Sequence, residues 1–316
     1  MTSSPAPVQI RLDQDHDHRL LRALAEAPRG LPMDALARSR GPGLSDRCLI
    51  VALGAGRVVG AITMDPGTGV IVGPQVARHF PQQRIGEQLI VAAERVAARY
   101  GRFELEAEPR GACAKLLQSL GYQPQGDRLQ RRFPRRRTRF GRSIAALNEQ
   151  LGLPHDYGVR HRLPLQPEPK ELVAAGPDKF ARPQQMTAPA LRAWERMRAA
   201  AALDGVELQL VSAFRSVRYQ AELIQRKLDD GQAIDQILAV SAAPGYSEHH
   251  SGAALDLTTP GSAVLEEEFA STAAYAWLKQ HAASHGFLES YPENNRHRIS
   301  YEPWHWCHRS GQQRHI

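Results

Sequence analysis

The residues of this chain most suited to chemistry lie close together in the segment SEHHSGAALD, which spans positions 247–256. The segment contains His249, His250 and Asp256, separated by small residues. A catalytic zinc ion takes three ligands of the His, Asp or Glu type and keeps one position open for water. Gly252 and the alanines beside it allow the chain to fold back, so that His249 and Asp256 can face one ion. The segment is therefore a candidate for two thirds of a metal site.

A second segment, YEPWHW at 301–306, contains the groups that would complete such a site. It carries His305, a further candidate ligand, with Glu302 three residues earlier. A hydrolytic site also needs a base for the proton of water and a cation for the oxyanion. Glu302 offers the base, and Arg215, after the strand-like run VELQLVSAF, offers the cation. Each signal is weak alone, because the chain has 13 histidines and most are expected to be structural or exposed.

Taken together, SAFRS, YSEHHSGAALDL and YEPWHW resemble the VanY-type zinc D-Ala-D-Ala carboxypeptidases in order, spacing and flanking residues. The family pattern SxHxxGxAxD is met over 247–256, and ExxH over 302–305. The resemblance covers roughly 143–309 and implies one zinc ion per chain. It assigns the metal ligands as His249, Asp256 and His305.

The same resemblance implies roles for four more residues. Glu302 is expected to be the general base, and Arg215 the cation facing the scissile carbonyl or the terminal carboxylate. Gln220 and Ser247 match positions that help to hold the C-terminus of the peptide. Two positions depart from the family pattern: His250 stands where glutamine is frequent, and Cys307 replaces a bulkier residue. We interpret His250 as a structural or exposed histidine. Cys307 is near enough in sequence to compete for zinc, but we interpret it, like the other two cysteines, as a thiol without a role in the site.

The first half has the pattern of a mixed α/β domain. Strand-like runs at 48–53 and 57–64 precede a stretch of helical periodicity over 84–101, then a strand at 103–107 and a helix near 111–121. This order resembles the GNAT acetyltransferase fold over roughly 8–133.

The GNAT resemblance implies damaged chemistry. Gly86 matches the second glycine of the family's RxxGxG/A pattern, but Arg84 replaces the first glycine and Pro81 the leading arginine. Leu117 stands where the family has a tyrosine that protonates the leaving thiolate, although Tyr122 lies nearby. Acetyl-CoA is a possible ligand, bound weakly at the start of the helix near residue 85, and we expect no useful acetylation.

The net charge of +7 has a local origin. The run RRFPRRRTRFGR at 131–142 holds seven arginines and no acid, and without it the chain has 33 basic and 33 acidic residues. This argues against a globally basic nucleic-acid binder. We interpret 134–142 as a solvated linker or as a contact for an anionic partner, and the sequence does not decide between these two interpretations.

The first residues form no signal-peptide core, and no run reaches the length of a membrane span. The three cysteines form no disulfide framework, which suits a reducing compartment. The expected location is the cytoplasm, where the substrate would be a peptidoglycan precursor or a recycled muropeptide. Neither a membrane nor a nucleic acid is an expected partner, and the oligomeric state stays open.

The sequence therefore predicts an α+β protein with three parts: a GNAT-like mixed α/β domain (1–133), an Arg-rich linker (134–142) and an α+β zinc peptidase domain with a small antiparallel sheet (143–316). The expected function is zinc-dependent carboxypeptidase activity on peptides ending in D-Ala, of D,D or L,D specificity. Two alternatives stay open. One is an acyl-CoA-binding or N-acetyltransferase protein with an auxiliary zinc domain, and the other is a zinc-stabilised interaction module without catalysis.

Overall fold

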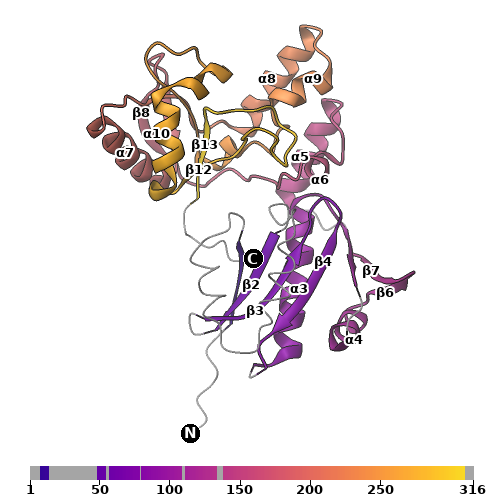
Figure 1. Ribbon diagram of the computed structural model, residues 1–316. Coiled ribbons are helices and arrows are strands. Elements are labelled where there is room, and N and C mark those ends of the chain that lie inside the picture. The colour runs from indigo at the N-terminus through magenta and orange to yellow at the C-terminus, as the bar shows by residue number, and fades with distance from the viewer. Residues whose placement is uncertain are drawn as a thin grey trace. The chain divides into compact units, whose positions relative to one another are not determined.

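The computed structural model describes residues 8–13, 48–54, 57–78, 80–108, 111–133 and 138–309 (Figure 1). The described residues fall into two compact units, 8–133 and 138–309. Among the described residues, no helix is both long enough and apolar enough to cross a membrane.

The N-terminal unit is built on a seven-stranded mixed sheet in the order β1-β2-β3-β4-β5-β7-β6. Its elements are β1 (Gln9–Asp13), β2 (Cys48–Gly54), β3 (Arg57–Met64), β4 (Val70–Val76), α3 (Gln82–Arg99), β5 (Glu104–Ala107), α4 (Gly111–Ser119), β6 (Gln123–Gln125) and β7 (Arg128–Arg132). All neighbouring strands are antiparallel except β4 and β5, which are parallel and pair only at Val70 and Ile71 of β4. The expected strands and helices of this half are confirmed.

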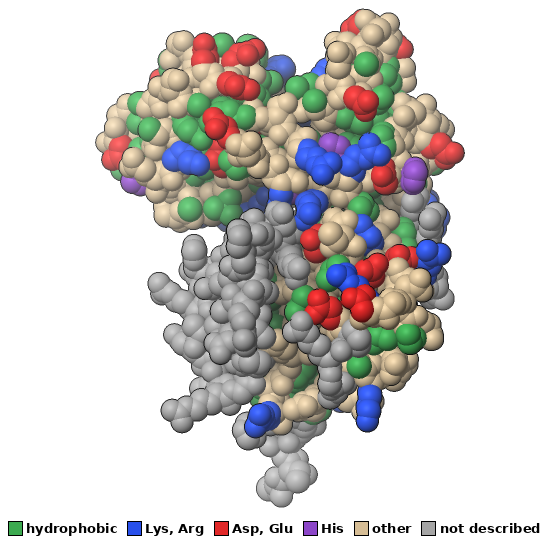
Figure 2. Space-filling view, turned by 45° about the vertical axis from the view of Figure 1, so that its right-hand side comes forward, with side chains coloured by type: hydrophobic (Ala, Val, Ile, Leu, Met, Phe, Trp, Pro, Cys, Tyr) green, Lys and Arg blue, Asp and Glu red, His purple; other side chains and the backbone are tan. Residues whose placement is uncertain are grey.

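The amphipathic helix α3 covers the sheet of the N-terminal unit (Figure 1). Its apolar residues recur at helical spacing, and those facing the sheet, including Leu89, Ala93 and Val96, are fully buried. Two arginines of the basic run, Arg131 and Arg132, belong to β7 and pair with glutamates on α3 and β5. On the face drawn in Figure 2, basic and acidic side chains are interspersed over the described surface.

The C-terminal unit contains a four-stranded antiparallel sheet in the order β10-β11-β13-β12 and a separate hairpin, β8-β9. Its elements are α5 (Arg139–Gln150), α6 (Tyr157–Arg160), β8 (Val173–Pro177), β9 (Pro183–Met186), α7 (Ala188–Leu203), β10 (Gln209–Ser212), α8 (Val217–Asp229), α9 (Ile234–Val240), η2 (Glu248–Ser251), β11 (Ala254–Thr258), η3 (Glu267–Ser271), α10 (Ala273–His281), η4 (Ala282–His285), β12 (Phe287–Glu289) and β13 (His305–His308), where η denotes a 3-10 helix. The small antiparallel sheet expected from the sequence is therefore present.

Two features of this unit differ from the sequence-based expectation. The proline-rich stretch LQPEPKELVAAGPDKFARP at 165–183, whose composition predicts a loop, contains β8 and the first residue of β9, which pair as a hairpin. The predicted start of the second domain, Ser143, lies inside α5. This helix begins four residues earlier because Thr138 caps it, its hydroxyl accepting a hydrogen bond from the Gly141 N–H at 3.0 Å. The second half of the basic run is thus the first turn of a helix whose Ile144 is buried.

Candidate active site

Two of the predicted ligands, Asp256 and His305, lie on one face of the four-stranded sheet. The strand register pairs Ser212 on β10 with Asp256 on β11, and Asp256 with His305 on β13. Paired side chains point to the same face, with Cβ atoms about 4.5–5.5 Å apart. The adjacent residues Leu255 and Trp306 point to the other face and pack in the core formed with α7 and α10. The alternation of each strand therefore separates a polar face from an apolar one.

The turn before β11 brings His249 to the same place. Its glycine, Gly252, has φ 66°, in the left-handed region, and a Cβ added there would lie 2.8 Å from Leu172 Cδ2. Only glycine meets both conditions without strain. The chain can therefore reverse tightly between His249 and Asp256, as the small residues of the segment predict.

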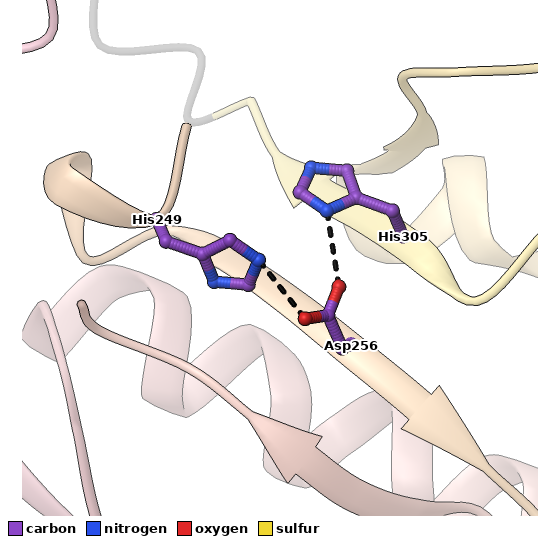
Figure 3. A group of neighbouring side chains, drawn as sticks. All are labelled: His249, Asp256 and His305. Carbon is purple, nitrogen blue, oxygen red and sulfur yellow. Dashed lines mark hydrogen bonds and ion pairs between the residues drawn. The ribbon is translucent and has the colours of Figure 1, made fainter. Parts of the chain in front are cut away.

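His249, Asp256 and His305 converge on one point (Figure 3). The Asp256 Oδ2 lies 3.1 Å from His249 Nε2, and its Oδ1 lies 3.1 Å from His305 Nδ1. One ligand atom from each residue lies within 4.8 Å of the others, and all three residues are buried. Ligand atoms around a tetrahedral zinc ion are about 3.4 Å apart, given bonds of about 2.0–2.1 Å. The donor set of two imidazoles and one carboxylate therefore fits zinc.

Hydrogen bonds on the far side of each ring select the histidine tautomers. The Nδ1 of His249 lies 2.6 Å from the carbonyl oxygen of Ala213, which can only accept, so Nδ1 carries the hydrogen. The Nε2 of His305 lies 3.1 Å from Glu248 Oε2. In the neutral form of each ring, the remaining nitrogen presents its lone pair toward Asp256. This is the arrangement in which outer partners orient metal-binding histidines.

The charges of the buried side chains also favour binding of a cation at this site. Burial opposes ionisation of Asp256, but His249 and His305 hold the pKa of its carboxyl well below the usual range. Burial disfavours the charged form of His305, yet its hydrogen bonds to Asp256 and Glu248 raise its pKa to about 10. The two carboxylates thus favour a second ring proton, on Nδ1. A metal ion that binds here must displace that proton.

Glu302 stands beside the three converging residues. Its Oε2 lies 3.8 Å from His305 Nδ1, and its side chain is 15% exposed. Burial raises the pKa of Glu302 to about 7, with His305 opposing the shift and Asp256 reinforcing it. A carboxylate with a pKa near neutrality, beside a candidate metal site, has the properties of a general base.

Arg215 reaches the same face from the segment that follows β10. Its Nη2 lies 3.5 Å from Asp256 Oδ2, and its Nη1 donates to Gln220 Oε1 at 3.1 Å. Gln220 is buried on α8 and donates to the Ala242 carbonyl at 2.8 Å. The structure therefore places Gln220 as a support that orients Arg215. Ser247 is buried directly before η2, and its carbonyl oxygen accepts a hydrogen bond from the backbone N–H of His250.

The two residues that depart from the family pattern lie nearby. His250 is fully buried, its Nδ1 lies 2.6 Å from the Arg215 carbonyl, and its Nε2 accepts from the Gly245 N–H at 3.1 Å. Burial lowers its pKa to about 4, so it is a neutral ring that ties η2 to Arg215. Cys307 lies two residues after His305 on β13. The cluster with metal-binding geometry in the described part of the chain does not include this thiol.

Glu248 is a site residue that the sequence reasoning missed. Its carboxylate accepts from His305 Nε2, from Ser290 Oγ at 2.5 Å and from Arg309 Nη2 at 2.6 Å. Arg309 and His305 hold its pKa well below the usual range, although burial acts in the opposite direction. Glu248 is next to His249 in sequence but contacts His305, so no local spacing pattern could have revealed the pair.

The positions singled out in the N-terminal unit have a packing role. A Cβ added to Gly86 would lie 2.6 Å from Leu116 Cδ2 and 3.3 Å from Pro74 Cγ. The space beside the Cα atom of Gly86 is thus filled by side chains of α4 and β4, so this glycine allows the helices and the sheet to pack closely. Leu117 is fully buried in the same core. The helix α3 begins at Gln82, so Arg84 is an exposed residue of its first turn.

Comparison with known proteins agrees with this geometry. The sequence profile of VanY, described as D-alanyl-D-alanine carboxypeptidase, matches residues 183–311, which include all the converging side chains. Residues 183–311 belong to the VanY family.

Individual relatives of this VanY-family domain match part of the chain. A proposed carboxypeptidase of Bacillus subtilis (strain 168), YodJ, is 31% identical over 174 residues, which cover 51% of this chain and 58% of YodJ. The chain thus spans little more than half of that relative. The solved structure of the LdcB LD-carboxypeptidase is 30% identical, with a TM-score of 0.42, over 45% of this chain and 69% of LdcB.

A different similarity is to the structure of an aminoglycoside 6'-acetyltransferase type Ii. It is 16% identical, with a TM-score of 0.32, over 40% of this chain and 98% of that chain. This is a likeness of fold only.

Proposed function

We propose that this protein is a zinc-dependent carboxypeptidase that hydrolyses peptidoglycan-type peptides ending in D-Ala. The observation that carries the proposal is the convergence of His249, Asp256 and His305 beside Glu302 and Arg215, within a VanY-family domain. Three buried ligands leave a fourth position for water, whereas a purely structural zinc is usually closed by four protein ligands.

The chain's own groups would share the work of hydrolysis. A zinc ion bound here would act as a Lewis acid and lower the pKa of a bound water to about 7. Glu302, with its raised pKa, would take the proton from the attacking water and return it to the leaving amine. Arg215, held by Gln220, would stabilise the oxyanion or bind the terminal carboxylate. Ser247 and Gln220 stay candidates for contact with the end of the peptide.

The substrate class follows from the family, and the bond specificity needs a direct assay. A muramyl pentapeptide ends in D-Ala-D-Ala, whereas the tetrapeptide ends in D-Ala attached to an L-centre of the preceding residue. Release of D-Ala should be measured from both peptides, with zinc-loaded protein and with protein treated with a chelator. We expect release from at least one of them, lost with the chelator and restored by zinc. Absence of release from both peptides by zinc-replete protein would contradict the proposal.

A further inference from the structure

We propose that Glu248 is a positioning residue, which fixes the tautomer and orientation of His305 so that His305 presents Nδ1 to the zinc site. The inference rests on the function proposed above and assigns a role to a residue that does not itself hold the metal. Glu248 Oε2 lies 3.1 Å from His305 Nε2, whereas Asp256 Oδ1 lies 3.1 Å from Nδ1 of the same ring. The two carboxylates therefore bind opposite nitrogens of one imidazole.

The bonding pattern shows why Glu248 acts as an acceptor. Its Oε2 accepts hydrogen bonds from Ser290 Oγ, at 2.5 Å, and from His305. Its Oε1 accepts a hydrogen bond from Arg309 Nη2 at 2.6 Å. A carboxyl that receives three donors has little room for a proton of its own, so the bond to His305 is Nε2–H donating to a carboxylate. In the neutral ring, the lone pair must then be on Nδ1, the nitrogen that faces Asp256.

The tertiary structure keeps this carboxylate in place. Glu248 is 6% exposed and belongs to η2, while Ser290 follows β12 and Arg309 follows β13. The Arg309 Nη2 also lies 3.3 Å from Ser290 Oγ, so the donors are linked to each other. Arg309 N–H donates to the Gly286 carbonyl at 2.8 Å, which fixes the backbone that carries the guanidinium. Glu248 is thus held by donors from two other segments before any metal binds.

This arrangement differs from that of His249, whose outer nitrogen donates to a backbone carbonyl, that of Ala213. A carbonyl is neutral, whereas Glu248 brings a full charge to the ring of His305. A charged acceptor strengthens the hydrogen bond and makes the opposite nitrogen a better ligand. We therefore expect His305 to be more sensitive than His249 to the loss of its outer partner.

The test uses the full chain with Glu248→Gln and Glu248→Ala, and measures zinc affinity by competition with a chromophoric chelator. Glutamine keeps the shape but removes the charge, and its amide can donate to Nε2 and select the wrong tautomer. Loss of such an outer partner typically weakens metal binding about 10–100-fold. The matched control is Glu289→Gln, because this carboxylate is also well buried but accepts from Tyr275 and Lys279.

Nitrogen NMR reports which ring nitrogen of each histidine carries the hydrogen. If Glu248 only stabilised the fold, its substitution would leave the His305 signal unchanged. We expect zinc-loaded wild type and the control to show His305 protonated at Nε2, and Glu248→Gln to show a changed His305 signal with little change at His249. Zinc affinity within threefold of wild type in both Glu248 variants, with an unchanged His305 signal, would overturn the inference. A wild-type protein that binds no zinc would instead contradict the proposed function, so the two failures are distinguishable.

Discussion

A glycine allows a close contact in both units, but the kind of group that makes this contact differs between them. In the N-terminal unit, the space beside Gly86 is filled by Leu116 of the protein itself. In the C-terminal unit, Gly252 allows a turn that brings His249 and Asp256 to a common point. A glycine in a motif therefore shows that something comes close, and only its surroundings show whether that is a packed side chain or a reactive group.

The comparison predicts that chemistry is confined to the second unit. Removing a ligand should have the largest effect. In His249→Ala, Asp256→Ala and His305→Ala, we expect bound zinc to fall from about one per chain to nearly none, because a site with three protein ligands has none to spare. Elemental analysis after dialysis measures this.

The matched control is His250→Gln, whose amide can still accept from the Gly245 N–H and donate to the Arg215 carbonyl. We expect it to retain zinc. If His250→Gln lost the metal while His249→Ala kept it, the assignment of the two adjacent histidines would be reversed.

The next largest effect is expected for Glu302→Gln. Loss of a general base typically lowers the rate about 10²–10⁴-fold, and glutamine cannot take a proton from water. Since Glu302 lies outside the predicted ligand set, zinc content should stay near wild type. Measuring D-Ala release together with zinc content tests the loss of activity and the retention of metal. Full turnover in the zinc-replete variant would contradict the role of Glu302 as the general base.

The boundary of the second unit can be tested by truncation. A fragment that starts at Thr138 retains the cap of α5, whereas one that starts at residue 151 lacks this helix. Without α5, the core loses Ile144, and the Asn148 bond to the Pro244 carbonyl is absent. We expect the shorter fragment to lose about 2–5 kcal/mol of unfolding free energy, from apolar burial and one buried hydrogen bond. Equal denaturant midpoints would show that α5 is dispensable.

A histidine pair outside the zinc site predicts a pH dependence of stability. His161 Nδ1 lies 2.9 Å from the His297 carbonyl, and His297 Nδ1 lies 3.1 Å from the His161 carbonyl. Burial chiefly, and then Arg296, lower the pKa of His297 to about 4; Glu248 opposes this shift, and Arg309 adds to it. The unfolded chain then binds the proton more readily, so stability is complete above about pH 6.5 and falls as the pH drops toward 4.

We expect the free energy of unfolding to fall by about 1–3 kcal/mol, since one pKa unit corresponds to about 1.4 kcal/mol and the ring of His297 is partly exposed. Denaturant unfolding at pH 7.5 and 4.5, in the presence of a chelator, measures it. In His297→Asn, the amide can replace the Nδ1 donor without titrating, so the difference between the two pH values should shrink. An unchanged difference would assign the pH dependence to other groups.

The smallest effect is expected for Gly86→Ala. Its methyl group would meet Leu116 Cδ2, so the N-terminal unit should lose about 1–2 kcal/mol of stability by overpacking. D-Ala release should be unchanged. Titration calorimetry of the wild type with acetyl-CoA sharpens the same comparison: weak or no binding is expected, because α4 fills the space beside Gly86. Tight binding together with acetylation of an amine would show chemistry in both units.

Much of the local structure was predictable from the sequence. The strands β2 and β3 and the helix α3 were predicted because apolar periodicity reflects which face of an element is buried. The hairpin of β8 and β9 was missed, because its proline and glycine residues are typical of loops and its pairing is set by the strand partner. The early start of α5 was missed because its arginines suggested a solvated linker.

The sequence by itself determined which groups could do chemistry: the residue types, and the turn that lets His249 and Asp256 meet within eight residues. Only the tertiary structure decided how these groups are held. The strand register places His305 opposite Asp256, and the contact between Glu248 and His305 joins residues 57 positions apart. The chemistry of a side chain is a property of a single residue, and a tight turn is a property of a short segment. The partner of a buried charge, in contrast, depends on strands that pair across long stretches of chain.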